Sequence, residues 1–219
     1  MNGIHLSPYL AAAVWGLCGL AAGALVRRAS VWLARLEGVE SGEEPWQVYG
    51  PMVLAGLLFA LFAWRLGASP LLLIRSLWIV VLVQVIFFDL EHHLILDRVL
   101  LPSALAALAL SLVTPNLGWL PALLTGLGTG IVFLAIAGLG ALIFHAEAMG
   151  LGDVKFSAFL GLILGLRPTL MAVLLGVVLA GLASLALWAL RLRTLRDSIA
   201  YGPFLAIGAL VALFALGSG

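Results

Sequence analysis

Cysteine is almost absent from this sequence, because Cys18 is the only one among 219 residues. A single thiol cannot form an internal disulfide, and it cannot supply the ligands of a four-cysteine zinc site. Because Cys18 lies in an apolar run, we interpret it as a small buried apolar residue. The sequence therefore indicates neither a disulfide framework nor a cysteine-based metal centre.

Charge is scarce as well. Charged residues make up 10% of the chain, whereas an ordinary soluble domain has roughly 25%. The net charge of +1 supplies no basic patch for nucleic acid, so we expect no such partner. Hydrophobic residues reach 64% and the mean hydropathy is +1.22. This composition predicts an all-α, polytopic membrane protein in contact with the lipid bilayer.

The beginning of the chain does not resemble a removable signal peptide. Residues 1–8 contain no basic segment, and the apolar run that follows ends at Arg27 and Arg28. We expect this run to remain as an anchor, with the N-terminus outside.

Apolar runs of sufficient length predict about eight transmembrane helices, since each needs about 20 mostly apolar residues. We expect them at residues 8–26, 51–66, 71–88, 98–114, 118–144, 154–166, 169–190 and 200–217. The polar segment 27–50 is predicted to carry a short amphipathic helix along the membrane, built from Val31, Trp32, Leu33 and Leu36. Gly126 and Gly130, and Gly176 and Gly181, fall near the four-residue spacing that permits close helix packing.

Basic residues favour one orientation of these spans. With the N-terminus outside, eight of the 11 basic residues fall in cytoplasmic segments, as the positive-inside rule requires. The eight are Arg27, Arg28, Arg35, Arg98, Lys155, Arg191, Arg193 and Arg196, and the three outside are Arg65, Arg75 and Arg167. This orientation places the acidic segments 89–98 and 145–153 on the same cytoplasmic face.

Ionisable residues gather at one border of the third predicted span, in the segment FFDLEHHLILDRVLLP at positions 87–102. They are Asp89, Glu91, His92, His93, Asp97 and Arg98. A second acidic position, Asp153, lies in the turn Met149-Gly-Leu-Gly-Asp-Val-Lys155. A carboxylate at a membrane border is costly unless it is solvated, paired or used in function. We therefore hypothesise that Asp89 and Asp153 form a two-carboxylate catalytic site at the membrane surface.

The two aspartates occupy different helix ends in this prediction. Asp89 should lie in the last turn of the third span, whereas Asp153 opens the sixth, where the helix dipole stabilises its charge. The alternative for Asp153 is an N-cap, a position that aspartate prefers. Gly150 and Gly152 favour the functional interpretation, because they permit backbone conformations closed to other residues and leave room for another chain to approach.

Two neighbouring carboxyl groups can hydrolyse a peptide bond. Like charges at short range cannot both ionise, so one group keeps its proton at a raised pKa while the other remains a carboxylate. The carboxylate takes a proton from water, and the acid hydrogen-bonds the scissile carbonyl and then protonates the leaving nitrogen. This chemistry requires no metal and no cofactor.

The other charged residues of the first segment have simpler interpretations. Asp97, which precedes Arg98, is expected to be a helix cap with a local ion pair, and a direct chemical role is the alternative. Glu91, His92 and His93 are expected to form a solvated turn, and a metal site is the alternative because Asp, Glu and His are metal ligands.

The second segment also carries residues outside the pair. Lys155 is expected either to neutralise the two carboxylates or to bind phospholipid headgroups. His145 and Glu147 are interpreted as interfacial loop residues.

Several short motifs occur in an order that resembles a known family. The first is Asp89-Leu-Glu-His-His-Leu-Ile-Leu-Asp97 followed by Leu101-Pro102, and the second is the Gly-x-Gly-Asp turn at 150–153. The segments YGPFLAIG at 201–208 and LLFALFAWR at 57–65 add to the pattern. Together they resemble the type IV prepilin peptidases, which are membrane aspartic proteases of the GxGD type.

The resemblance implies a catalytic pair, Asp89 and Asp153, and a cut after a glycine in the short basic leader of a prepilin or pseudopilin. It implies the bacterial inner membrane, a cytoplasmic active site, and contact with pilus or type II secretion assembly proteins. Residues expected to bind substrate or support the pair are Gly150, Gly152, Lys155, Asp97, Glu91 and Glu147.

The sequence also departs from the family pattern. Leu96 replaces a usual proline and Glu91 a frequent aspartate. Many bacterial members carry a zinc-binding domain with two cysteine pairs in the first loop, associated with N-methylation of the cleaved pilin, but the loop here contains no cysteine. We expect residues 1–50 to be a first transmembrane helix plus a reduced counterpart of that domain, and residues 51–219 to be a peptidase domain without methyltransferase activity.

Two other functions use the same residues. An ion- or proton-coupled transporter would load its ion on these carboxylates, but it should carry charges deep inside several spans, whereas here they gather at one border. An inactive relative with a scaffold role in pilus or secretion assembly is the third possibility.

Overall fold

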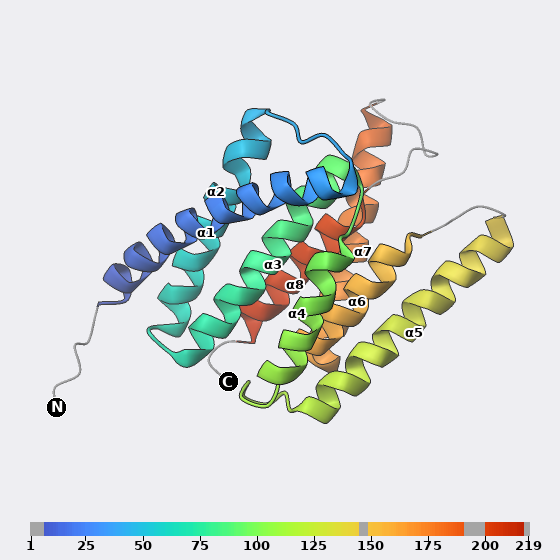
Figure 1. The fold of residues 1–219 in the computed structure, drawn as a ribbon. Coiled ribbons are helices and arrows are strands. Elements are labelled where there is room, and N and C mark those ends of the chain that lie inside the picture. The colour runs from blue at the N-terminus through green and yellow to red at the C-terminus, as the bar shows by residue number, and fades with distance from the viewer. Residues whose placement is uncertain (1–6, 145–148, 191–199, 217–219) are drawn as a thin grey trace. The chain divides into compact units, whose positions relative to one another are not determined.

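The computed structural model describes residues 7–144, 149–190 and 200–216. These residues form eight α-helices and no strand, so the all-α fold class is confirmed (Figure 1). The helices are α1 (Pro8–Glu37), α2 (Pro45–Leu66), α3 (Pro70–His92), α4 (Asp97–Leu110), α5 (Trp119–Phe144), α6 (Leu151–Leu164), α7 (Leu166–Ala189) and α8 (Gly202–Ala215). His145, Glu147, Arg191, Arg193 and Arg196 lie outside the described residues.

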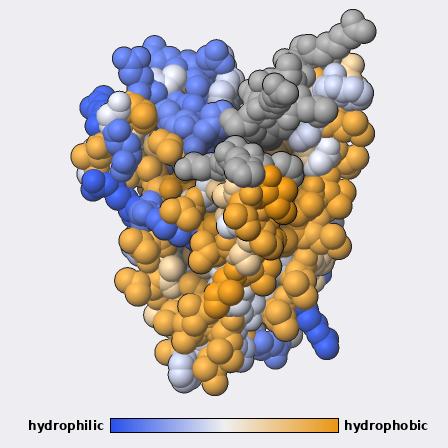
Figure 2. Space-filling model, turned by 90° about the vertical axis from the view of Figure 1, so that its right-hand side faces the viewer, coloured by the Kyte–Doolittle hydropathy of each residue, from blue (hydrophilic) through white to orange (hydrophobic). Residues whose placement is uncertain are grey.

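Five of the helices are long and apolar enough to cross a membrane. They are α1, α2, α3, α5 and α7. The remaining helices α4, α6 and α8 have 14 residues each, and 14 residues of helix extend about 21 Å against a hydrocarbon core of about 30 Å. Hydrophobic side chains cover most of the face drawn in Figure 2, as a lipid-facing surface requires. The chain is therefore a polytopic membrane protein.

The chain divides into two compact units. The first contains α1, α2 and α3 and ends at His92, and the second runs from His93 to Ala215 and contains α4 to α8.

Helix α1 is longer than the sequence predicts. It continues for 30 residues to Glu37, so the segment that includes Trp32 and Leu36 is the end of α1 and not a separate amphipathic helix. No glycine or proline interrupts the chain between Arg27 and Glu37. The helix ends at Gly38, whose φ of 72° is left-handed and whose N–H donates to the carbonyls of Ala34 and Arg35. The connection to α2 is consequently only residues 38–44.

Helix α2 also begins earlier than predicted. Its first residue is Pro45, a favoured residue for the first helical position, and Pro51 lies inside the helix. Glu44 and Gln47 form a capping box at this end, in which each side chain accepts from the other residue's backbone N–H.

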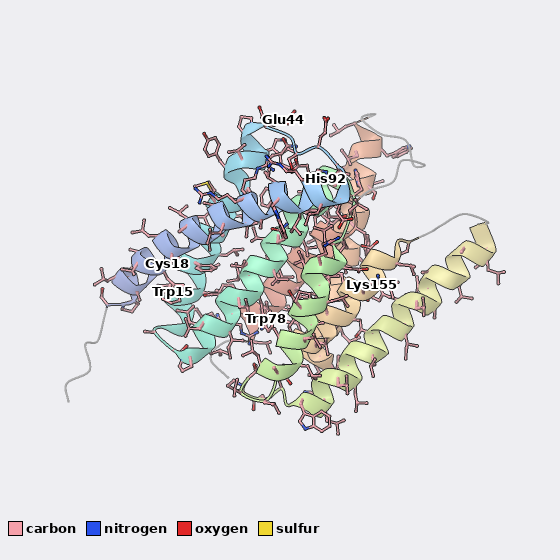
Figure 3. The ribbon with its side chains drawn as sticks, in the orientation of Figure 1. Trp15, Cys18, Glu44, Trp78, His92 and Lys155 are labelled. Carbon is pink, nitrogen blue, oxygen red and sulfur yellow. The ribbon has the colours of Figure 1, made fainter. Side chains whose placement is uncertain are left out.

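Small residues hold α1 against α2. A Cβ atom added to Gly19 would lie 2.7 Å from the Cβ of Phe59 and 2.8 Å from the Cα of Gly56, so the helices approach closely only because glycine stands there. Cys18, on the neighbouring position, is exposed, which makes its interpretation as a buried residue wrong (Figure 3). The tightly packed face of α1 carries Gly19 instead.

Polar side chains join α1 to α3 within the first unit. The indole N–H of Trp15 donates to the hydroxyl of Ser76 over 2.8 Å. The amide of Gln84 donates to the hydroxyl of Ser30 over 3.0 Å, and both residues are buried. These bonds satisfy polar groups that would otherwise be costly inside a membrane.

Glycines also position α6 in the second unit. A Cβ atom on Gly161 would lie 2.7 Å from the Cα of Gly126 on α5, and one on Gly130 would lie 3.1 Å from the Cβ of Ala158. Gly176 lies similarly close to Leu205 of α8. The predicted packing role is confirmed for Gly126, Gly130 and Gly176 but is wrong for Gly181, because a Cβ there would meet nothing within 4 Å.

Candidate active site

Asp89 lies in the last turn of α3, as predicted. The residue is 5% exposed, and the preceding Phe88 packs its ring against the imidazole of His92 with centroids 4.5 Å apart. Its backbone is therefore fixed by a helix whose end is packed, and the carboxyl group belongs to the first unit.

Glu91, two residues further on, is not part of a solvated turn. Its side chain is 5% exposed, and its oxygens accept from the guanidinium of Arg27 over 3.1 Å and from the N–H of Gly42 over 2.5 Å. His92 is 5% exposed as well. Only His93 fits the prediction, because it is exposed and its φ of 53° ends the helix.

His92 and His93 do not complete a metal site with the acidic residues that the structure describes. In the part of the chain that the structure describes, no group of three or more His, Cys, Asp or Glu side chains could hold a metal ion. The ring nitrogen Nε2 of His92 lies 3.8 Å from the nearer oxygen of Glu91.

Asp153 lies in the first turn of α6, in the second unit. The interpretation as an N-cap is wrong, because the helix begins at Leu151 and Gly150 is the N-cap. The backbone N–H of Asp153 donates to the carbonyl of Gly150 over 3.1 Å. The side chain therefore stands at the positive end of the helix dipole, which stabilises a carboxylate.

The glycines before Asp153 do not adopt unusual backbone angles, and Gly152 matters because it leaves room for a neighbouring residue. Gly150 has φ −70° and ψ 146°, which other residues adopt freely, and Gly152 is helical, so the predicted need for special conformations is wrong. The predicted close approach is confirmed at Gly152, where an added Cβ would lie 3.1 Å from the Cβ of Ile95. The segment before α4 thus lies directly against the first turn of α6.

Lys155 and Asp97 join the same two elements. The ammonium group of Lys155 contacts both carboxylate oxygens of Asp97, at 2.6 and 2.8 Å. Asp97 is the first residue of α4 after the N-cap Leu96, so the cap interpretation is wrong, and its ion pair reaches α6. Both side chains are about half exposed, at 48% and 50%, so the pair contributes little to stability.

Tyr201, just before α8, was not predicted to be a site residue. Its side chain is half-buried and lies within electrostatic range of Asp153. The motif Tyr201-Gly-Pro was visible in the sequence, but no local pattern linked it to a residue 48 positions earlier.

Comparison with known proteins identifies the family. The model of the type IV leader peptidase family matches residues 76–185, which is half of the chain and includes Asp89 and Asp153. The chain belongs to the type IV leader peptidase family. The resemblance seen in the sequence motifs is confirmed.

Individual leader peptidases are similar over a longer stretch. The prepilin leader peptidase/N-methyltransferase of Pseudomonas putida is 31% identical over 171 residues, which is 74% of this chain and 57% of the relative. The protein of the same name from Bacillus subtilis is 29% identical over 73% of this chain and 62% of its own length. The one from Legionella pneumophila is 26% identical over 78% and 61%.

These relatives are longer than the matched region, so the chain spans about three fifths of the length of the leader peptidases it matches. No solved structure matches the chain.

Proposed function

We propose that this leader peptidase family member is a membrane aspartic endopeptidase that removes the leader from type IV prepilins or pseudopilins. The observation that carries the proposal is the family match over 76–185, which contains both aspartates in the motifs that define the candidate pair. Family membership also favours a peptidase over an ion-coupled transporter or an inactive scaffold.

In this proposal Asp89 and Asp153 share one proton. One aspartate remains a carboxylate and removes a proton from the attacking water, which adds its oxygen to the scissile carbonyl carbon. The other is a neutral acid that hydrogen-bonds the carbonyl oxygen and then donates its proton to the leaving nitrogen. The C–N bond then breaks, so the leader ends in a new carboxyl group and the mature pilin begins with a new amino group.

Contacts within the second unit support the proposal from the α6 side. Ile95 lies against Gly152, the residue that precedes Asp153, and only five residues separate Ile95 from Asp89 in the sequence. The ion pair between Lys155 and Asp97 also marks the starts of α6 and α4 as neighbours. Asp153 thus stands beside the segment that directly follows the end of α3 in the chain.

The proposed topology has eight crossings, with the short helices α4, α6 and α8 spanning together with their flanking residues. Two crossings, α4 and α5, then separate the end of α3 from the start of α6, so Asp89 and Asp153 come to the same face. The positive-inside rule makes that face cytoplasmic. On the basis of family membership we assign the chain to the bacterial inner membrane, with pilus or secretion assembly proteins as further partners.

We further propose that the chain is a peptidase without methyltransferase activity. The connection between α1 and α2 consists of residues 38–44 and contains no cysteine. It therefore provides no thiolate pairs for a zinc-binding domain.

One assay tests both parts of this proposal. The chain, reconstituted in lipid vesicles with a prepilin as substrate and S-adenosylmethionine present, is expected to release a mature pilin cut after the leader glycine, with an unmodified N-terminus. Mass spectrometry of the product measures both features. Uncut prepilin would contradict the peptidase, and a product heavier by one methyl group would contradict the absence of methylation.

A further inference from the structure

The carboxylate of Glu91 lies where helix electrostatics disfavour it. It occupies the last turn of α3, and the negative end of a helix dipole destabilises a nearby anion. Its side chain is only 5% exposed, so water compensates little of this cost. Helix stability alone does not account for a buried carboxylate at this position.

Groups from α1 and from the α1–α2 loop compensate the charge of Glu91. The guanidinium of Arg27, on α1, donates to one oxygen over 3.1 Å, and the backbone N–H of Gly42, in the loop, donates to the other over 2.5 Å. Arg27 also donates to the carbonyl oxygen of Gly42. The three residues form a closed cycle of hydrogen bonds that joins α1, the loop and the end of α3.

A second contact joins the start of α2 to the same part of α3. The rings of Trp46 and Phe87 stack with centroids 6.5 Å apart, and Gly50 lies so close to the ring of Phe87 that a Cβ atom would overlap it. The indole N–H of Trp46 donates to the carboxylate of Glu44 over 2.5 Å, which ties this turn to the loop. Figure 3 shows Glu44 and His92 at the same end of the first unit.

These contacts bracket Asp89 along α3. Phe87 precedes it by two residues and is covered by α2, whereas Glu91 follows it by two residues and is bound by Arg27 and the loop. The last turn of a helix frays easily when its end is not held. The α1–α2 loop therefore helps to hold this turn.

We infer that Glu91 is a positioning residue, whose carboxylate fastens the α1–α2 loop to the last turn of α3 and so fixes the backbone that carries Asp89. The effect on catalysis rests on the proposed peptidase function, whereas the fastening itself does not. Both carboxylate oxygens of Glu91 accept hydrogen bonds, one from Arg27 and one from the N–H of Gly42. This distinguishes Glu91 from a residue that transfers a proton.

Two measurements on the full chain in vesicles test this inference. Cleavage kinetics on a prepilin give kcat and KM, and hydrogen–deuterium exchange gives the protection of the loop amides at 38–44. Glu91→Ala is expected to lower kcat about 30-fold with KM within about 2-fold, because misplacing a catalytic group by an ångström costs up to about 100-fold. The same variant should exchange the loop amides at least about 10-fold faster, since it loses the bond to Gly42.

Two further variants separate positioning from chemistry. Glu91→Gln keeps one acceptor oxygen, so its loss of kcat should be about 3-fold, far smaller than that of Glu91→Ala. Arg27→Gln should also lower kcat and speed loop exchange, although Arg27 lies on α1 and has no proposed part in the reaction. Arg28→Gln is the matched control, because Arg28 is the exposed neighbour on the same helix, and it should behave as the wild type.

Unchanged loop exchange in Glu91→Ala, or in Arg27→Gln if the alanine variant does not accumulate, would overturn the fastening. A Glu91→Gln variant as inactive as Asp89→Asn, with normal loop exchange, would show instead that Glu91 takes part in the chemistry. A wild-type chain that cleaves no prepilin would contradict the proposed function, and loop exchange alone would then decide whether the fastening exists.

Discussion

Replacement of either Asp89 or Asp153 by asparagine is expected to lower prepilin cleavage by about 1,000-fold or more. Asparagine has nearly the same size and still forms hydrogen bonds, but it can neither accept the proton of water nor donate one to the leaving nitrogen. General acid–base catalysis contributes about 100- to 10,000-fold. The double variant should retain about the same residual activity as either single variant, because the two groups act as a unit.

The measurement is single-turnover cleavage of a prepilin in vesicles, with the amount of membrane-inserted enzyme determined for each variant. Glu40→Gln is the matched control, since it removes an exposed carboxylate from the α1–α2 loop and should retain wild-type activity. Cleavage at the wild-type rate by Asp89→Asn or Asp153→Asn, at equal enzyme, would remove that residue from the catalytic pair.

Substitution of Gly161 by valine is expected to disrupt the packing of α6 on α5. A Cβ atom at this position would lie 2.7 Å from the Cα of Gly126 and 2.8 Å from the carbonyl oxygen of Thr125. Both are backbone atoms, so relief requires the two helices to separate. Overpacking typically costs about 1–3 kcal/mol, and we expect the unfolding free energy to fall by about 3 kcal/mol.

The disrupted packing of α6 should also affect the candidate site, because α6 carries Asp153 in its first turn. Gly128→Val is the control on α5, since a Cβ there would meet nothing within 4 Å, and it should change stability by less than about 0.5 kcal/mol. Denaturant-induced unfolding in mixed micelles, followed by tryptophan fluorescence, measures both variants. Equal stability of Gly161→Val and Gly128→Val would contradict the close α5–α6 contact.

Composition and local motifs were sufficient to predict the class of fold. The apolar runs gave the all-α membrane protein, the border after Phe88 placed Asp89 in a last helical turn, and the glycine spacing on α5 marked its contact with α6. Each of these features depends on residues that are close together in the sequence. The charged residues Arg27 and Arg28 suggest an early end of α1, but the helix continues until Gly38 stops it.

Features that depend on distant residues were not predicted. The polar neighbours of Glu91 in the sequence predict a solvated side chain, but its partners Arg27 and Gly42 lie 64 and 49 positions away. The position of Asp97 beside Arg98 predicts a local role, but Asp97 binds Lys155, which is 58 positions away. No periodicity or capping pattern carries that information, since it arises only when the helices pack.

The central claim, that the carboxyl groups of Asp89 and Asp153 meet in one catalytic site, is tested most directly by cysteine cross-linking. In a Cys18→Ser background, Asp89→Cys and Asp153→Cys are combined in one chain. Vesicles that contain this variant are treated either with an oxidant or with a cross-linker whose two thiol-reactive groups are joined by one carbon. A disulfide requires Cα atoms within about 7 Å, and the reagent adds a few ångströms.

We predict that the pair is joined, as detected by mass spectrometry of the linked peptides. Asp89→Cys combined with Leu71→Cys should not be joined, because the length of α3 separates these two residues by about 27 Å. A pair that is never joined, with or without a bound prepilin peptide, would contradict the shared site.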